Sequence, residues 1–151
     1  MSGQEWKAAA RKELRATIRA ALEPDFACAF ASPSTVILRE PGVYGIVTLQ
    51  TSNTSLPDAW EVYINYGAST DAWFAARGYG PPKPRSDADC QLRDRHTPDP
   101  HIFPDSQFQR LRIPRQEWAS DNGRARLTSY LTKVTTSEIA PWIRSAWATL
   151  S

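Results

Sequence analysis

The chain has 151 residues, of which 41% are hydrophobic, and its 18 basic and 16 acidic side chains give a formal net charge of +2. A chain of this length can bury about 68–70% of the surface that it exposes when unfolded, which predicts a single domain over residues 1–151. No apolar stretch approaches the roughly 20 residues of a membrane span, and the first residues carry no secretory signal, so we expect a cytoplasmic protein without a membrane partner. The near-neutral charge disfavours nucleic acid as a partner.

Residues 4–22 are predicted to form an amphipathic helix. Apolar side chains recur every three or four residues from Trp6 to Leu22. A basic ridge runs beside this stripe and consists of Lys7, Arg11, Arg15 and Arg19, each four residues from the next. Clustered cations raise the local potential, so the ridge either contacts an acidic partner or a polyanion, or it is an ordinary solvated helix face.

The middle of the chain is predicted to form an antiparallel sheet of four to five strands. Strand patterns occur at residues 26–30, 35–39, 43–51, 60–66 and 107–113. A Pro-Gly pair ending at Gly42 predicts a type II turn, which needs a residue that tolerates positive φ. In residues 60–66 the apolar side chains alternate with Glu61, Tyr63 and Asn65, which therefore share the other face of the sheet. Such a face can stay solvated, so we expect these three side chains to line a recognition surface.

Helices and a proline-rich excursion are predicted for the rest of the chain. A short helix follows Asp71, residues 79–106 form the excursion, and the final residues are helical. Pro141 is expected in the first turn of a last helix that is capped near Thr136 or Ser137. The first and last helices would cover one face of the sheet, which gives an α+β fold.

Four segments carry a resemblance to a known family. They are Lys12-Glu13-Leu14, Val62-Tyr63-Ile64-Asn65-Tyr66-Gly67, Cys90-Gln91-Leu92-Arg93-Asp94-Arg95 and Ile139-Ala140-Pro141-Trp142. In this order they resemble the bacterial domain of unknown function 4304 family over nearly the whole chain, although Ile64 and Tyr66 replace residues commoner in that family. The resemblance implies an α+β domain without an established activity and carries over no catalytic residue.

Cys90, His96 and His101 are candidates for a nucleophile with its base or for a metal site. Their spacings match no strong zinc pattern, and a structural zinc would need a fourth ligand from Asp94, Asp99 or Asp105. The alternative is that both histidines are partly exposed loop residues. Cys28 is the only other cysteine, so we expect reduced thiols. Phosphate-binding loops and serine-hydrolase motifs are missing, and we expect no cofactor and no metal.

Arg93 and Arg95 flank Asp94 in a segment that is predicted to be extended. Their guanidinium groups would then project to one side, where they could hold a phosphate or a carboxylate. The alternative is that they form ion pairs with Glu61 or Asp89 inside the protein.

Two of the six tryptophans, Trp73 and Trp118, lie in short or irregular segments near Arg77 and Arg115. An exposed tryptophan beside an arginine is typical of the residues that dominate binding energy at interfaces. The alternative is that these segments pack over the sheet. We expect the core to contain Trp6, Trp60 and Trp147.

Taken together, the patterns favour a non-enzymatic module that binds another bacterial protein, such as an immunity-type or accessory protein. Catalytic motifs are missing, whereas Arg, Trp and Tyr are plentiful. A second hypothesis is a small enzyme or ligand-binding domain centred on Cys90, Arg93, Arg95, His96 and His101. A third is polyanion binding through the basic ridge. The identity of the partner and the oligomeric state stay open.

Overall fold

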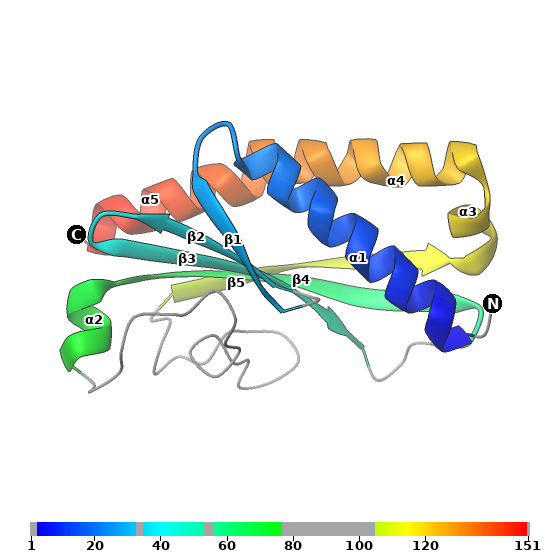
Figure 1. Ribbon diagram of the computed structural model, residues 1–151, viewed down its shortest axis with the longest axis horizontal. Helices are drawn as coiled ribbons and strands as arrows, with labels where there is room; N and C mark the ends of the chain where they lie inside the picture. Colours follow the sequence, from blue (N-terminus) through cyan, green and yellow to red (C-terminus); the bar gives the residue numbers. More distant parts are fainter. Residues whose placement is uncertain (1–2, 33–34, 53–55, 77–104, 151) are drawn as a thin grey trace.

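The computed structural model of the protein describes residues 3–32, 35–52, 56–76 and 105–150. It confirms the predicted α+β class, because helices cover one face of a five-stranded antiparallel sheet (Figure 1). In Figure 1 the helices of residues 121–150 form the upper layer, the sheet lies below them, and the N-terminal helix slants from that layer down to the level of the sheet.

The sheet is a meander in which each strand pairs with its neighbour in the chain. Its strands are β1 (Ala27–Ser32), β2 (Thr35–Glu40), β3 (Val43–Thr51), β4 (Ala59–Thr70) and β5 (Asp105–Pro114), in the spatial order β1-β2-β3-β4-β5. Gly42 has a φ of 84° in the turn between β2 and β3, as the sequence predicts. The longest strand, β4, pairs with β3 on one edge and with β5 on the other.

In the described part of the chain, four helical segments lie over the sheet, and two short helices lie at its ends. The elements are α1 (Gly3–Leu22), α2 (Asp71–Ala76), α3 (Arg115–Ala119), α4 (Asp121–Val134), the π-helical segment η2 (Thr135–Ile139) and α5 (Ala140–Leu150). Helix α1 packs on α4, and α5 packs on β3 and β4. In Figure 1, α3 lies at the same end as the N-terminus, and α2 and the C-terminus lie at the opposite end.

The predicted helix start near Thr136 or Ser137 is wrong, because α4 continues through one π turn into α5. Both hydroxyl groups instead donate to carbonyl groups of the preceding turn, Thr136 to Thr132 at 3.0 Å and Ser137 to Lys133 at 2.5 Å. Pro141 has no N–H for the carbonyl group one turn earlier. The wider π turn directly before it accommodates this missing hydrogen bond, so the helix is not interrupted.

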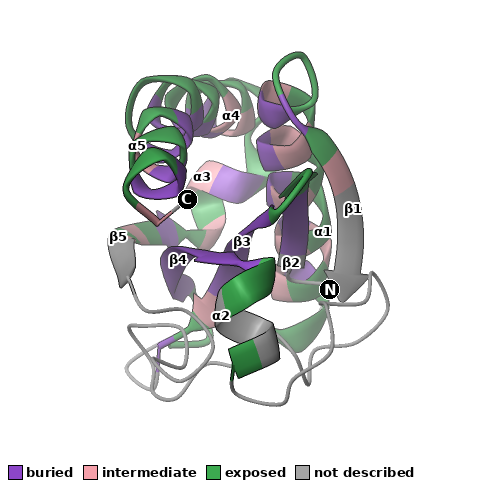
Figure 2. Cartoon of the chain, turned by 90° about the vertical axis from the view of Figure 1, so that its left-hand side faces the viewer, coloured by how far each residue is buried: buried purple, intermediate pink, exposed green. Residues whose placement is uncertain are grey.

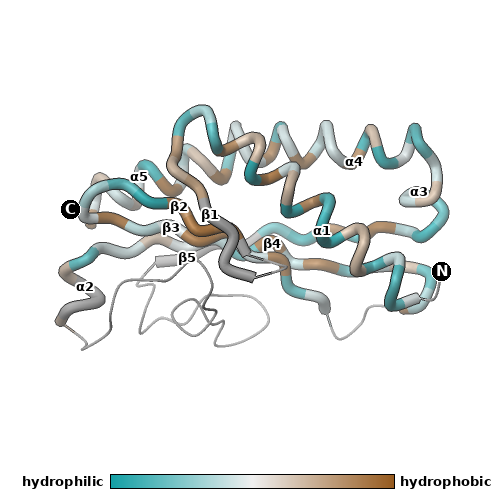
Figure 3. The backbone as a smooth tube through the Cα atoms, viewed as in Figure 1, coloured by the Kyte–Doolittle hydropathy of each residue, from teal (hydrophilic) through white to brown (hydrophobic). Residues whose placement is uncertain are grey.

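The hydrophobic core lies between the helices and the inner face of the sheet. Helix α1 contributes Trp6, Ala10, Leu14, Ile18 and Leu22, and β4 contributes Trp60, Val62, Ile64, Tyr66 and Ala68. These sets follow the helical and alternating periods read from the sequence. Figure 2 shows the middle strands coloured as buried, and Figure 3 shows hydrophobic residues along the same strands. Full burial of one large apolar side chain contributes about 1.5–3 kcal/mol to folding.

The end of the core under α5 is closely filled. Trp147 packs edge-on against Phe26, with ring centres 5.5 Å apart, and its Nε1 donates to the backbone oxygen of Tyr44 at 2.7 Å. The absence of a side chain at Gly45 allows this approach, because a Cβ there would lie 3.3 Å from the Trp147 ring and 3.2 Å from Ile143. We call this region the α5 end.

Candidate functional site

The corner at residues 56–58, directly before β4, is anchored by its backbone oxygens. The oxygen of residue 56 accepts a hydrogen bond from Lys7 Nζ at 2.5 Å, and the oxygen of residue 57 accepts one from Trp6 Nε1 at 3.0 Å. The oxygen of residue 58 accepts one from Arg115 N at 2.8 Å. The donors belong to the start of α1 and the start of α3. Three segments that are far apart in the sequence are thereby joined at one end of the molecule.

The turn between α3 and α4 fixes the position of α3. The Ser120 hydroxyl accepts a hydrogen bond from Gly123 N at 3.2 Å and so caps α4. Gly123 lies so close to α3 that a Cβ would come within 2.1 Å of the backbone oxygen of Glu117. Only glycine fits there, and the close approach holds α3 across the end of α4.

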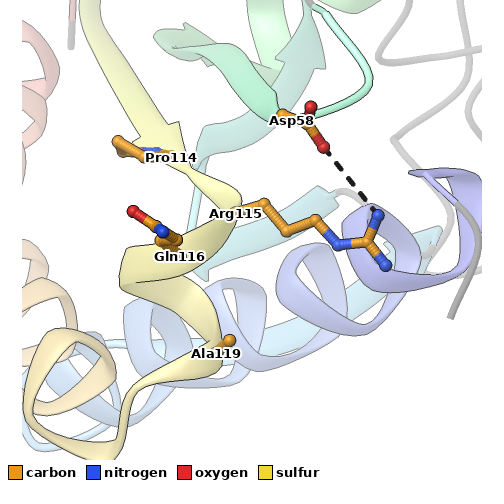
Figure 4. A pocket seen from close by; sticks show the side chains of 5 residues that line it. All are labelled: Asp58, Pro114, Arg115, Gln116 and Ala119. Carbon is orange, nitrogen blue, oxygen red and sulfur yellow. Dashed lines mark ion pairs between the residues drawn. The ribbon is translucent and has the colours of Figure 1, made fainter.

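Two neighbouring hollows flank α3, and together we call them the α3 site. The first hollow has a volume of about 510 Å³ and is lined by Asp58, Pro114, Arg115, Gln116 and Ala119 (Figure 4). The second has a volume of about 300 Å³ and is lined by Trp6, Arg115, Trp118, Ala119 and Arg124. The hollows share Arg115 and Ala119, so a bound segment could enter both. Their volumes fall at the lower end of the range for ligand-binding pockets.

The arginines of the α3 site are paired with strongly exposed carboxylates. Arg115 Nη1 lies 4.0 Å from Asp58 Oδ1, the pair marked in Figure 4, and Arg124 Nη2 lies 3.1 Å from Asp121 Oδ1. The side chains of Asp58 and Asp121 are 89% and 100% exposed. Water screens such pairs, and they contribute little to stability. Neither of these two ion pairs therefore holds its guanidinium group firmly.

Trp118 and Arg115 line the same hollow, which the sequence could not establish. Trp118 is only 7% exposed, so it forms a wall of the hollow and does not protrude as the binding hypothesis expected. The Arg124 guanidinium lies 5.6 Å from the centre of the Trp118 ring. This cation–π contact orients Arg124 at the hollow.

Glu61, Tyr63 and Asn65 alternate with the core residues of β4 and so lie on the face away from the helices, as predicted. The expected solvent exposure is wrong at these positions, because the three residues are 9%, 7% and 0% exposed. Neighbouring strands supply partners: Arg110 donates to Glu61 Oε2 at 3.0 Å, and Asn65 Nδ2 donates to Gln50 Oε1 at 3.0 Å. The position of β4 between two strands makes these contacts possible.

The basic ridge of α1 is partly buried, and its cations have partners within the protein. Arg11 Nη2 donates to Thr51 Oγ1 at 3.3 Å, and Arg19 forms an ion pair with Glu23 at 2.6 Å. Burial, and then the charge of Arg19, lowers the pKa of Arg15. The positive charges of the ridge are therefore partly engaged within the protein. Polyanion binding through the ridge stays a prediction.

Several predicted site residues lie outside the part of the chain that the structure describes. They are Cys90, Arg93, Arg95, His96, His101 and the side chain of Trp73. The ligand-binding hypothesis centred on them stays a prediction. Among the described residues, no group of three or more His, Cys, Asp and Glu side chains could hold a metal ion. None of the described helices has the length and apolar character needed to cross a membrane.

The sequence indicated only part of the α3 site. It marked Arg115 and Trp118, which are close in the chain and line the second hollow. Nothing local marked Asp58, Ala119 or Arg124, because their proximity to these residues arises from the corner and from the turn at Gly123.

Comparison with known proteins identifies no relative of this chain: no family model, curated protein or solved structure matches it. The resemblance to the bacterial domain of unknown function 4304 family therefore stays a prediction.

Proposed function

We propose that the protein is a non-enzymatic interaction module, of the immunity or accessory kind, that binds another protein in the bacterial cytoplasm at the α3 site. The observation that carries this proposal is the pair of adjoining hollows, of about 510 and 300 Å³, which share Arg115, with tryptophan side chains lining the smaller one. These two residue types dominate the energy of protein interfaces.

The chemistry of the lining residues supports binding in preference to catalysis. Among the described residues that line the hollows there is no cysteine, serine or histidine, and the carboxylate among them, Asp58, faces Arg115 in a screened ion pair. General acid–base or nucleophilic catalysis needs a reactive group with a partner that tunes it. The lining residues instead offer shape, aromatic walls and hydrogen-bond donors.

The shared wall at Ala119 provides the test. Ala119 is exposed and lines both hollows, so Ala119→Trp would fill them without removing a contact. Ala148→Trp is the matched control, because Ala148 is an exposed helical alanine on α5 at the opposite end of the molecule. We expect both variants to keep the melting temperature of the parent protein.

The partner would be captured in cells with a photocrosslinking amino acid at Gln116, beside the first hollow, and at Ser145 on α5 as the reference. The captured protein would then be purified and its affinity measured by calorimetry. We expect Ala119→Trp to weaken binding at least about tenfold, while Ala148→Trp leaves it unchanged. Equal binding by both variants, or no capture at Gln116 above that at Ser145, would overturn the proposal.

A further inference from the structure

We infer that the α3 site takes an acidic peptide segment, with an Asp or Glu side chain of the partner in the second hollow and a neighbouring apolar side chain in the first. This inference rests on the proposed function and specifies the partner's chemistry.

The charged side chains that line the second hollow are all positive. In the part of the chain that the structure describes, its lining holds two cations, Arg115 and Arg124, and no carboxylate. Both side chains are partly open, with exposed fractions of 37% and 38%. Guanidinium groups bind carboxylates through paired hydrogen bonds, so two of them facing one hollow select an anion.

The walls of the second hollow strengthen this selection. Trp6 and Trp118 are 2% and 7% exposed, and their rings replace water on the protein side. An arriving carboxylate would cover the remaining open side. Opposite charges interact more strongly where water is excluded, so the pairs formed with the ligand would be stronger than the existing exposed pairs.

The ion pair between Arg115 and Asp58 is weak. The 4.0 Å between Arg115 Nη1 and Asp58 Oδ1 exceeds the 2.7–2.9 Å of a charge-assisted hydrogen bond. Asp58 belongs to the first hollow and is 89% exposed, so it can turn into water when a ligand binds. The first hollow also contains Pro114 and Ala119, which suit an apolar side chain next to the acidic one.

The probe is an array of acetylated, amidated heptapeptides with a central Glu or Asp and varied apolar neighbours. A second array carries Gln or Asn at the centre. Binding of fluorescein-labelled hits would be measured by anisotropy at low and high salt. We expect the acidic peptides to bind at least about tenfold more tightly than their amide counterparts, with an advantage that shrinks as salt rises.

Variants assign the effect to the second hollow. Arg115→Gln and Arg124→Gln should each weaken binding of the acidic peptides about tenfold and leave the amide peptides unchanged. Asp58→Asn should strengthen acidic-peptide binding severalfold by removing a competing carboxylate. Arg126→Gln is the matched control, because Arg126 is an exposed arginine on the same helix as Arg124. Circular dichroism would check that each variant is folded.

The outcomes separate this inference from the function on which it rests. If the two arrays bind equally and Ala119→Trp abolishes both, the interaction site stands and its preference for acidic peptides is wrong. The inference also fails if the variants of Arg115 and Arg124 behave like Arg126→Gln. If neither array contains a peptide that Ala119→Trp weakens, the proposed interaction at the α3 site is itself contradicted for peptide partners.

Discussion

The two ends of the molecule use the same kinds of residue in opposite ways. At the α5 end, Trp147 packs on Phe26 and donates to a buried backbone oxygen, and little space remains. At the α3 site, Trp118 lies under Arg124 and borders a hollow. A tryptophan with a full set of neighbours stabilises the fold, whereas one with an open side leaves surface for a partner. The difference between the ends therefore separates the residues needed for folding from those available for binding.

The greatest loss of stability is expected from Trp147→Ala. The variant removes a buried ring and a buried hydrogen bond, so the free energy of unfolding should fall by about 3–5 kcal/mol. Urea denaturation would measure it. Trp118→Ala should cost clearly less, because solvent in the adjoining hollow can occupy part of the space. Equal losses would show that the two ends are equally well packed.

A loss of about 3 kcal/mol is expected from Gly123→Ala, because its Cβ would lie 2.1 Å from the backbone oxygen of Glu117 and the turn between α3 and α4 would have to open. The same change should weaken binding at the α3 site. Asn122→Ala, at the exposed neighbouring position, is the control. Unchanged denaturation of Gly123→Ala would contradict the close approach of the two helices.

Larger side chains should also lower stability by different amounts at the α5 end and at the α3 site. Gly45→Ala would place a Cβ 3.2–3.3 Å from Ile143, Leu38 and Trp147, and we expect it to cost about 1–2 kcal/mol. Ala119→Trp adds a far larger group but extends into hollows, so its cost should stay below about 0.5 kcal/mol. Thermal denaturation of both variants tests the contrast. A larger loss for Ala119→Trp would reverse it.

The last prediction concerns the reactivity of Cys28 on β1. Burial, followed by the charge of Glu23, raises the pKa of its thiol from 9.0 to about 11, with Arg19 opposing. In a Cys90→Ser variant, alkylation by iodoacetamide near neutral pH should be about 100-fold slower than for a free thiol, and its rate should keep rising beyond pH 9. A plateau at pH 9 would contradict the burial.

The same thiol gives stability a dependence on pH. Between pH 9 and 11 the unfolded chain loses the Cys28 proton while the folded chain retains it. The unfolded state then binds fewer protons, so the contribution of this group to the free energy of unfolding falls as pH rises through that interval.

The fold was more accessible from the sequence than the site. The spacing of Trp6, Leu14 and Ile18 and the alternation around Val62 report which side of each element is buried, and periodicity carries that information locally. The burial of Asn65 was not accessible, because it depends on side chains from other strands, such as Gln50, whose amide oxygen accepts its hydrogen bond.

The sequence also did not predict that α4 continues into α5, and the reason is again packing between elements. Thr136 and Ser137 are good helix caps in isolation, yet packing of the flanking helical faces keeps the backbone helical and turns their hydroxyls to the preceding carbonyls. The α3 site could not be predicted either, because it depends on contacts between distant parts of the chain. Trp6, Asp58 and Arg115 are far apart in the chain, and no local pattern specifies that they meet.

The corner at residues 56–58 has a consequence for how such a protein can evolve. Its three anchoring hydrogen bonds end on backbone oxygens, which every amino acid possesses. Leu56 and Asp58 can therefore mutate without loosening the corner, provided that the donors on α1 and α3 are kept. Descendants of this chain would be able to alter the rim beside Arg115, and with it their choice of partner, while inheriting the same scaffold.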